Sequence, residues 1–124
     1  MTDNLLEVRQ LKQHIKLSAS WFSKARYLYA VDDISFTLKP GETLGLVGES
    51  GCGKSTLARS ILKLIEPTGG QIFYQGQDIT EFNGQQMIPL RKEIQIIFQD
   101  PMDSLNARHT VGIILEEPYV IHHM

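Results

Sequence analysis

Cysteine is almost absent from the sequence: Cys52 is the only one among 124 residues, so no disulfide can form within the chain. Such a shortage is typical of proteins from a reducing compartment. Hydrophobic runs are short as well, and none reaches the roughly 20 residues that a membrane-spanning helix needs. The N-terminus, Met1–Asn4, lacks the basic and apolar regions of a secretion signal. These absences favour a cytoplasmic protein.

The sequence also has no excess of positive charge, because its 12 Lys and Arg residues are outnumbered by 14 Asp and Glu residues, for a formal net charge of -2. Proteins that bind nucleic acids usually carry a strongly basic face, so we expect no nucleic-acid partner. The four histidines are scattered, with His122 and His123 just before the last residue, which argues against a metal site. With 42% hydrophobic and 21% charged residues, the composition is typical of one globular domain.

Glycine is concentrated where a phosphate-binding loop would need it. A glycine, four residues, a second glycine, a lysine and a hydroxyl residue follow one another in the stretch Gly48-Glu49-Ser50-Gly51-Cys52-Gly53-Lys54-Ser55-Thr56. The apolar run Thr43–Val47 before it predicts a buried strand, and the periodicity of Lys54–Ile65 after it predicts a helix. Strand, loop and helix in this order are the setting that a phosphate loop requires.

The residue types of this loop suit a polyphosphate. Glycines lack Cβ atoms, so consecutive backbone N–H groups can turn toward one anion, and the helix points its positive N-terminus at it. Lys54 adds a charge worth roughly 4 kcal/mol at about 4 Å and an effective dielectric constant of about 20. Ser55 can place its hydroxyl on Mg²⁺. The flanking strand and helix disfavour the alternative of a plain Gly/Ser turn, and Cys52 is better explained as a small loop residue than as a catalytic one.

The rest of the chain predicts strands joined by turns. Period-two or apolar runs predict strands over Leu5–Leu11, Ala30–Leu38, Gln71–Tyr74 and Ile94–Phe98. Turn residues mark Lys39–Glu42 and Gln75–Gln77. We expect the early strands to be antiparallel and half exposed. The apolar runs Thr43–Val47 and Ile94–Phe98 are expected to be central strands of a parallel or mixed sheet that helices cover.

Two helices are expected in the C-terminal part. A short one after Gly84 would be limited by Pro89. Thr110 would cap a last helix that runs from Val111 to about Glu117, just before Pro118.

Several stretches together resemble the ATP-binding subunit of an ABC transporter, and most closely the di- and oligopeptide importers, which include uptake systems for antimicrobial peptides. These stretches are Ala30–Phe36, Gly41–Arg59, Ile65–Ile72 with Gly76–Ile79, and Ile97–Pro101 with Ser104–Asn106 and Arg108. The phosphate loop alone would identify only a large superfamily, whereas the loop and the glutamine stretch Ile97–Pro101 together are specific. The resemblance implies an α/β fold, namely an incomplete P-loop NTPase core with an N-terminal antiparallel β subdomain. It implies an antiparallel and phosphate-loop region over about residues 1–80, and the Q-loop strand and start of a helical subdomain over about residues 81–124.

The resemblance also implies roles for single residues. Residues Gly48–Thr56 would bind ATP: Lys54 at the β- and γ-phosphates, Thr56 at the α-phosphate, and Ser50 to Gly53 through backbone N–H groups. Ser55 would hold Mg²⁺. Gln99 would be the Q-loop glutamine that reaches Mg²⁺ and the attacking water, so Gln99 and Lys54 are the candidate catalytic residues. The implied partners are transmembrane permease subunits, which the segment after Gln99 would face, and a second ATP-binding subunit. The implied location is the inner face of the cell membrane.

The sequence departs from the family pattern in two places. Family members stack an aromatic residue on adenine, and the corresponding position after Leu11-Lys12-Gln13-His14 is Ile15 here. Trp21 takes this role if the segment is aligned backward without gaps from Ala30; a tryptophan without a ligand role is the alternative. Ala107 stands where the subfamily usually has proline, which would loosen the permease-facing loop.

The resemblance covers only the N-terminal half of a nucleotide-binding subunit. The sequence has no Leu-Ser-Gly-Gly-Gln signature, no apolar strand that ends in Asp-Glu and no switch histidine. Asp100 imitates a magnesium-binding aspartate, but Gln99 intervenes between it and the apolar run. We therefore expect ATP binding by this chain and hydrolysis only in the complete subunit. A stand-alone or truncated module without turnover is the alternative; a small P-loop kinase or GTPase is disfavoured, because Asn-Lys-x-Asp and an arginine-rich lid are missing.

Overall fold

The computed structural model covers residues 1–124 and describes residues 3–17, 21–22, 24, 26–49 and 53–124. The chain forms two compact units, Met1–Glu81 and Phe82–Met124. The first unit contains a sheet and the helix of the phosphate loop, and the second contains short helices joined by irregular chain.

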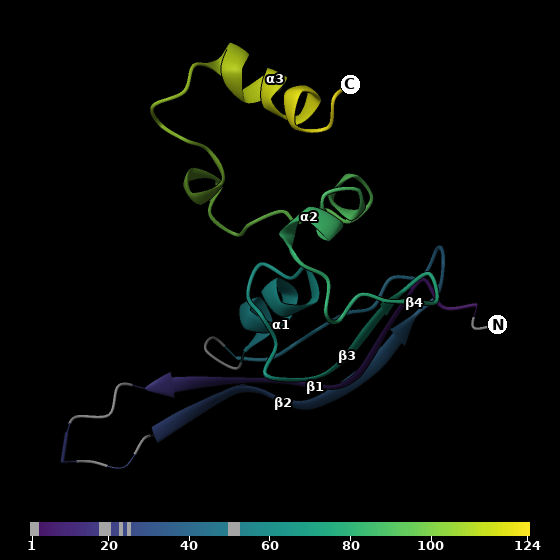
Figure 1. Ribbon diagram of the computed structural model, residues 1–124, viewed down its shortest axis with the longest axis vertical. Coiled ribbons are helices and arrows are strands. Elements are labelled where there is room, and N and C mark those ends of the chain that lie inside the picture. Colours follow the sequence, from purple (N-terminus) through teal and green to yellow (C-terminus); the bar gives the residue numbers. More distant parts are fainter. Residues whose placement is uncertain (1–2, 18–20, 23, 25, 50–52) are drawn as a thin grey trace. The chain divides into compact units, whose positions relative to one another are not determined.

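The first unit is built on an antiparallel sheet of four strands in the order β2-β1-β3-β4 (Figure 1). The strands are β1 (Leu6–Leu17), β2 (Arg26–Leu38), β3 (Gly69–Tyr74) and β4 (Gln77–Asp78). β1 pairs with β2 from Leu6, opposite Leu38, to Leu17, opposite Arg26, whereas its pairing with β3 ends at Lys12. The predicted N-terminal antiparallel β subdomain is confirmed.

Both long strands extend further than their sequence patterns predicted. β1 was expected to end at Leu11 and β2 to begin at Ala30, because the residues between them show no clean alternation. In the structure residues 12–17 and 26–29 continue the hairpin, with Ile15 opposite Leu28 and Lys16 opposite Tyr27. Cross-strand backbone hydrogen bonds thus form a two-stranded arm beyond the four-stranded sheet, where periodicity alone gave no strand.

The core of the first unit lies between the sheet and α1 (Lys54–Ile61). α1 contacts β1 and β2. The fully buried side chains of this unit include Val8 and Leu11 of β1 and Ile72 of β3, and Leu57 of α1 is 6% exposed. Large aliphatic side chains removed from water in this way contribute roughly 1.5–3 kcal/mol each, so this small core holds the phosphate-loop helix on the sheet.

Both predicted turns of the first unit are present. Gly41 has a φ of 74°, and the N–H of Glu42 donates to the carbonyl of Lys39 at 3.1 Å, as in a type II turn with proline and glycine at its centre. Gln75 and Gly76 have φ values of 48° and 80° and join β3 to β4. Two positive φ angles in a two-residue connection are typical of a type I′ hairpin turn.

α1 ends at Ile61 and not at Ile65, where the apolar periodicity predicted its end. Lys63 adopts a left-handed conformation with a φ of 56°, which stops the helix. Its side chain is buried, and Nζ donates to Oε2 of Glu66 at 2.7 Å and to the carbonyl of Thr80. These bonds hold the chain after α1 in place, a tertiary effect that periodicity does not report.

The two predicted central strands are wrong for this structure. Residues 43–49 and 95–98 lie outside every helix and strand of the described chain. Val47 is 92% exposed and Ile97 is 97% exposed. Apolar runs of this kind are typical of strands buried on both faces by parallel neighbours. The only sheet among the described residues is antiparallel and does not include them, so these runs have no hydrogen-bonding partners there.

The second unit consists of α2 (Gly84–Met87), the 3₁₀ helices η1 (Leu90–Lys92) and η2 (Pro101–Ser104), and α3 (Val111–Ile121). Asn83 and Gln86 form a capping box at α2: Oδ1 of Asn83 accepts from the N–H of Gln86 at 2.9 Å, and Oε1 of Gln86 accepts from the N–H of Asn83 at 2.9 Å. The short helix expected before Pro89 is therefore present.

α3 begins where it was predicted but ends later. The Thr110 hydroxyl accepts from the N–H of Ile113 at 3.3 Å, which confirms the cap. The helix does not stop before Pro118 but contains it. Proline removes one N–H donor, yet its fixed φ is compatible with a helix. The remaining backbone hydrogen bonds therefore continue the helix to Ile121.

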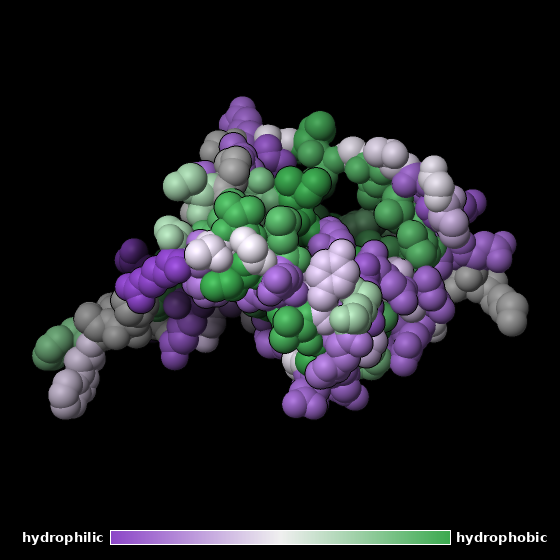
Figure 2. All heavy atoms as spheres, turned by 90° about the horizontal axis from the view of Figure 1, so that it is seen from above, coloured by the Kyte–Doolittle hydropathy of each residue, from purple (hydrophilic) through white to green (hydrophobic). Residues whose placement is uncertain are grey.

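Many hydrophobic side chains remain at the surface (Figure 2). In α3 they include Val111, Leu115, Tyr119 and Val120. Among the described residues, no helix has both the length and the apolar character needed to span a bilayer.

Candidate nucleotide site

The helix of the phosphate loop starts at a glycine that no other residue can replace without strain. Gly53 has a φ of 95° and lies at the N-terminus of α1, in the left-handed region that glycine adopts freely. A Cβ atom at this position would lie 2.0 Å from the carbonyl oxygen of Ala30 in β2. The second glycine of the motif is therefore required by close contact between two backbones.

Lys54 is directed back toward the start of the loop. Its Nζ donates a hydrogen bond to the carbonyl oxygen of Gly48. This bond joins the first glycine of the motif to the first turn of α1. A phosphate oxygen that enters the loop would take the place of the Gly48 carbonyl as acceptor.

The first turn of α1 presents one cation and two hydroxyl groups. Ser55 is exposed and Thr56 is half-buried. Leu57 is buried, and its N–H donates to the carbonyl of Gly53 at 2.8 Å. A buried leucine directly after the polar residues fixes their position, so that the positive end of the helix and the Ser55 hydroxyl remain accessible to a ligand.

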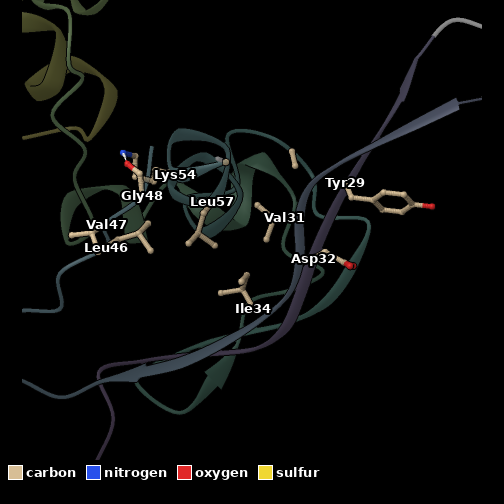
Figure 3. A pocket seen from close by; sticks show the side chains of 11 residues that line it. Tyr29, Val31, Asp32, Ile34, Leu46, Val47, Gly48, Lys54 and Leu57 are labelled. Atoms are coloured by element: carbon tan, nitrogen blue, oxygen red, sulfur yellow. Dashed lines mark hydrogen bonds between the residues drawn. The ribbon is translucent and has the colours of Figure 1, made fainter. Parts of the chain in front are cut away.

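A cavity of about 430 Å³ lies beside Lys54. Figure 3 shows Lys54 next to Gly48, whereas the side chains of Tyr29 and Asp32 lie on the other side of β2, away from Leu57. The volume falls in the range of small-molecule sites. The cavity is lined by Tyr29, Ala30, Val31, Asp32, Ile34, Leu46, Val47, Gly48, Gly53, Lys54 and Leu57.

Sequence reasoning missed the contribution of β2 to this site. Ala30 approaches Gly53, and Val31 and Ile34 line the cavity. No motif marks these residues for such a role, because their place beside the loop follows from how α1 packs on the sheet.

The structure brings together part of the predicted set. Gly48, Gly53 and Lys54 all line the cavity. Glu49 and Ser55 are exposed. Ser50, Gly51 and Cys52, three further predicted contacts, lie outside the described residues.

Trp21 is not among the residues that line this cavity. It lies in the connection between β1 and β2 and is 99% exposed. The adenine contact assigned to it from the sequence therefore gains no support from the geometry and stays a prediction.

Gln99 and Lys54 belong to different units. Gln99 is exposed and follows the apolar run that ends at Phe98. Next to it, Asp100 caps η2: its Oδ1 accepts from the N–H of Met102 at 2.9 Å. A carboxylate used as a cap has a local structural role, which agrees with the interpretation of Asp100 as part of the glutamine stretch. A joint site of Gln99 and Lys54 stays a prediction.

Comparison with known proteins now decides the family. The profile of the family described as ABC transporter matches residues 31–116, which include the phosphate loop and the glutamine stretch. The chain belongs to the ABC transporter family. The resemblance drawn from the motifs is confirmed.

Relatives within this family are transport ATP-binding proteins. The chain is 46% identical over 124 residues to the oligopeptide transport ATP-binding protein AppF of Bacillus subtilis, with 98% of this chain and 38% of the relative covered. It is 48% identical over 117 residues to the dipeptide transport ATP-binding protein DppF of Escherichia coli, with 94% and 35% covered. The chain thus spans between about a third and two fifths of the length of these relatives.

Solved ABC structures share the fold. A dimeric ATP-binding cassette in a post-hydrolysis state, bound to ADP and Pi, matches with a TM-score of 0.75 at 22% identity, over 93% of this chain and 47% of that one. The protein CbiO1 of Clostridium perfringens, part of an ABC transporter complex, matches with a TM-score of 0.64 at 28% identity, over 85% and 38%. These matches confirm the predicted incomplete α/β P-loop NTPase fold.

Proposed function

We propose that the chain binds ATP with Mg²⁺ and forms the N-terminal part of the ATP-binding subunit of a peptide importer. The observation that carries the proposal is the cluster of Gly48, Gly53 and Lys54 around one cavity. The lysine already donates to a carbonyl oxygen there, and the helix N-terminus lies beside it. Relatives named for oligopeptide and dipeptide transport support the substrate class.

The residues present fit a magnesium–triphosphate. Lys54 would hold the β- and γ-phosphates, and Thr56 the α-phosphate. Backbone N–H groups of residues 48–53, Gly48 and Glu49 included, would surround them. The exposed hydroxyl of Ser55 is a hard oxygen donor of the kind that Mg²⁺ accepts. When bound, the ion would neutralise part of the phosphate charge.

The proposal extends to the complete protein. There, Gln99 would reach Mg²⁺ and the attacking water, the segment after it would face transmembrane permease subunits, and a second ATP-binding subunit would complete the site. The protein would then act at the inner face of the cell membrane and couple ATP hydrolysis to peptide uptake. In this proposal, residues 1–80 form the antiparallel and phosphate-loop region, and residues 81–124 begin the helical subdomain.

Calorimetry with the purified chain tests the site. Wild type should bind Mg-ATP, and Lys54→Ala should abolish the measurable heat because the main cation of the loop is lost. Lys39→Ala, which removes an exposed lysine from the turn after β2, should bind as wild type does. Equal affinity in wild type and Lys54→Ala would overturn the site assignment, provided that circular dichroism shows both to be folded.

A further inference from the structure

The hairpin between β1 and β2 projects beyond the rest of its sheet. β3 accompanies β1 only as far as Lys12, opposite Gly69. From there β1 and β2 continue alone, until Leu17 lies opposite Arg26. Figure 1 shows this end of the hairpin extending past β3, and we name it the arm, residues 14–17 and 26–29 with Trp21, Phe22 and Lys24 of its connection. A two-stranded hairpin on its own is marginally stable in water.

Both faces of the arm carry apolar or aromatic groups together with a cation. Residues directly opposite each other in an antiparallel pair share a face. One face therefore has Ile15 and Leu28 opposite each other, followed by Leu17 and Arg26. The other has His14 opposite Tyr29 and Lys16 opposite Tyr27. The aliphatic and tyrosine side chains of these four pairs are all between 39% and 62% exposed.

The connection at the end of the arm adds two fully exposed aromatic side chains. Trp21 is 99% exposed and Phe22 is 100% exposed. Figure 2 shows hydrophobic and near-neutral residues at this extremity, between the grey ones. Neighbouring exposed apolar groups are typical of surfaces that bind a protein or a membrane.

The arm also holds the positive charge that the chain as a whole lacks. Residues 14–29 contain three of the 12 Lys and Arg residues and none of the 14 Asp and Glu residues. Lys16, Lys24 and Arg26 belong to the arm and are exposed. A locally basic segment on a chain with a net charge of -2 selects an anionic surface.

We propose that the arm inserts its aromatic end into the interface of an anionic lipid bilayer. Tryptophan and tyrosine side chains favour the headgroup level of a bilayer, and lysine and arginine are attracted to anionic lipids there. A bilayer interface surrounds an inserted segment on all sides, which suits an arm that is apolar and cationic on both faces; a protein partner would cover one face. The pairing of β1 with β2 satisfies the backbone groups between the two strands, and the hydrated headgroup region, unlike the hydrocarbon core, offers water to the groups on the outer edges. The proposal does not depend on nucleotide binding.

Vesicle binding of the 124-residue chain tests the proposal. We expect the chain to sediment with phosphatidylcholine vesicles that contain phosphatidylglycerol, less so with phosphatidylcholine alone, and less at high salt. Trp21 is the only tryptophan, so its emission reports the arm directly. It should shift to shorter wavelength on vesicles and be quenched by brominated acyl chains, while Mg-ATP without vesicles should leave it unchanged.

Double variants distinguish vesicle binding through the arm from nonspecific electrostatic or hydrophobic attraction. Trp21→Ser with Phe22→Ser should abolish sedimentation without loss of structure, because both side chains are exposed. Lys24→Gln with Arg26→Gln should weaken binding on the order of thirtyfold. Lys39→Gln with Lys92→Gln removes the same charge from exposed sites outside the arm and should leave binding within about threefold.

Three results would overturn the proposal. The first is an absence of vesicle binding, which would leave an acidic protein as the surface that the arm meets. The second is that the two double charge variants, inside and outside the arm, weaken vesicle binding equally. Such a result would mean nonspecific electrostatic attraction and not binding through the arm. The third is an emission change of Trp21 that requires ATP and ignores vesicles, which would assign the arm to adenine.

Discussion

The carbonyl oxygen of Ala30 occupies the space where a Cβ atom of Gly53 would lie, with only 2.0 Å between the two positions. This contact joins β2 to the start of α1, and it forces the loop residue to be glycine. The phosphate-loop pattern is thus a packing requirement as well as a requirement for backbone N–H groups that face an anion.

Gly53→Ala should therefore destabilise the first unit and abolish ATP binding. The new methyl group would meet the Ala30 carbonyl, and the left-handed φ of 95° would be strained for alanine. We expect a loss of at least about 2 kcal/mol in the free energy of unfolding, measured by urea denaturation, and no binding heat with Mg-ATP.

Gly41→Ala is the matched control for backbone strain. Gly41 also has a positive φ, 74°, but apart from its own atoms and its two chain neighbours no atom lies within 4 Å of the position of its Cβ. The substitution should lower the free energy of unfolding by about 1 kcal/mol, from conformational strain alone. The affinity for ATP should not change. Similar losses of stability in the two variants would contradict the importance of the contact with Ala30.

The stability of the first unit should also depend on pH through Asp78. Its side chain accepts hydrogen bonds from the N–H of Thr80, at 2.9 Å, and from the Thr80 hydroxyl. These bonds lower the pKa of Asp78 below its ordinary value of 3.8. A lowered pKa in the folded state contributes stability above the unfolded pKa, and this contribution disappears as the pH falls through the folded one.

Asp78→Asn should thus be less stable than wild type at pH 7, by less than about 1 kcal/mol because the carboxylate is exposed. The difference should vanish as the pH falls below 3.8. Urea midpoints measured from neutral to acidic pH check this, with Asp3→Asn as a control that removes a carboxylate elsewhere in the unit. A difference that stays constant down to the lowest pH would show that ionised Asp78 is not the cause.

The closeness of Gly48, Gly53 and Lys54 could be predicted from the sequence, whereas the surroundings of these residues could not. The three residues belong to one short loop and the helix after it, so the motif alone sufficed to place them around one cavity. The place of Ala30, the buried position of Lys63 and the length of the arm depend on contacts between segments distant in sequence. Such contacts leave no periodicity for a pattern to reveal.

The failure of the two central strands has a different physical cause. Apolar composition shows that Thr43–Val47 and Ile94–Phe98 would be stable as buried strands, but a strand also needs a neighbour with which to exchange backbone hydrogen bonds. The described residues provide no such neighbour. The apolar pattern therefore shows that these runs need neighbouring strands, and the described residues do not provide them.

Exposed apolar runs of this kind should make the chain associate with itself. Ile97 is 97% exposed and has apolar neighbours on its N-terminal side, a combination that favours strand pairing between molecules. Ile97→Lys should slow the rise of light scattering in a concentrated solution several-fold. A charge within the exposed run opposes its pairing with the same run of another molecule. The free energy of unfolding should change by less than about 0.5 kcal/mol, since an exposed side chain loses no buried contact. Ile97→Val, which keeps the residue apolar, should scatter as wild type does. If both variants aggregate at the wild-type rate, the self-associating surface lies elsewhere, and the exposed apolar residues of α3 are the next to be changed.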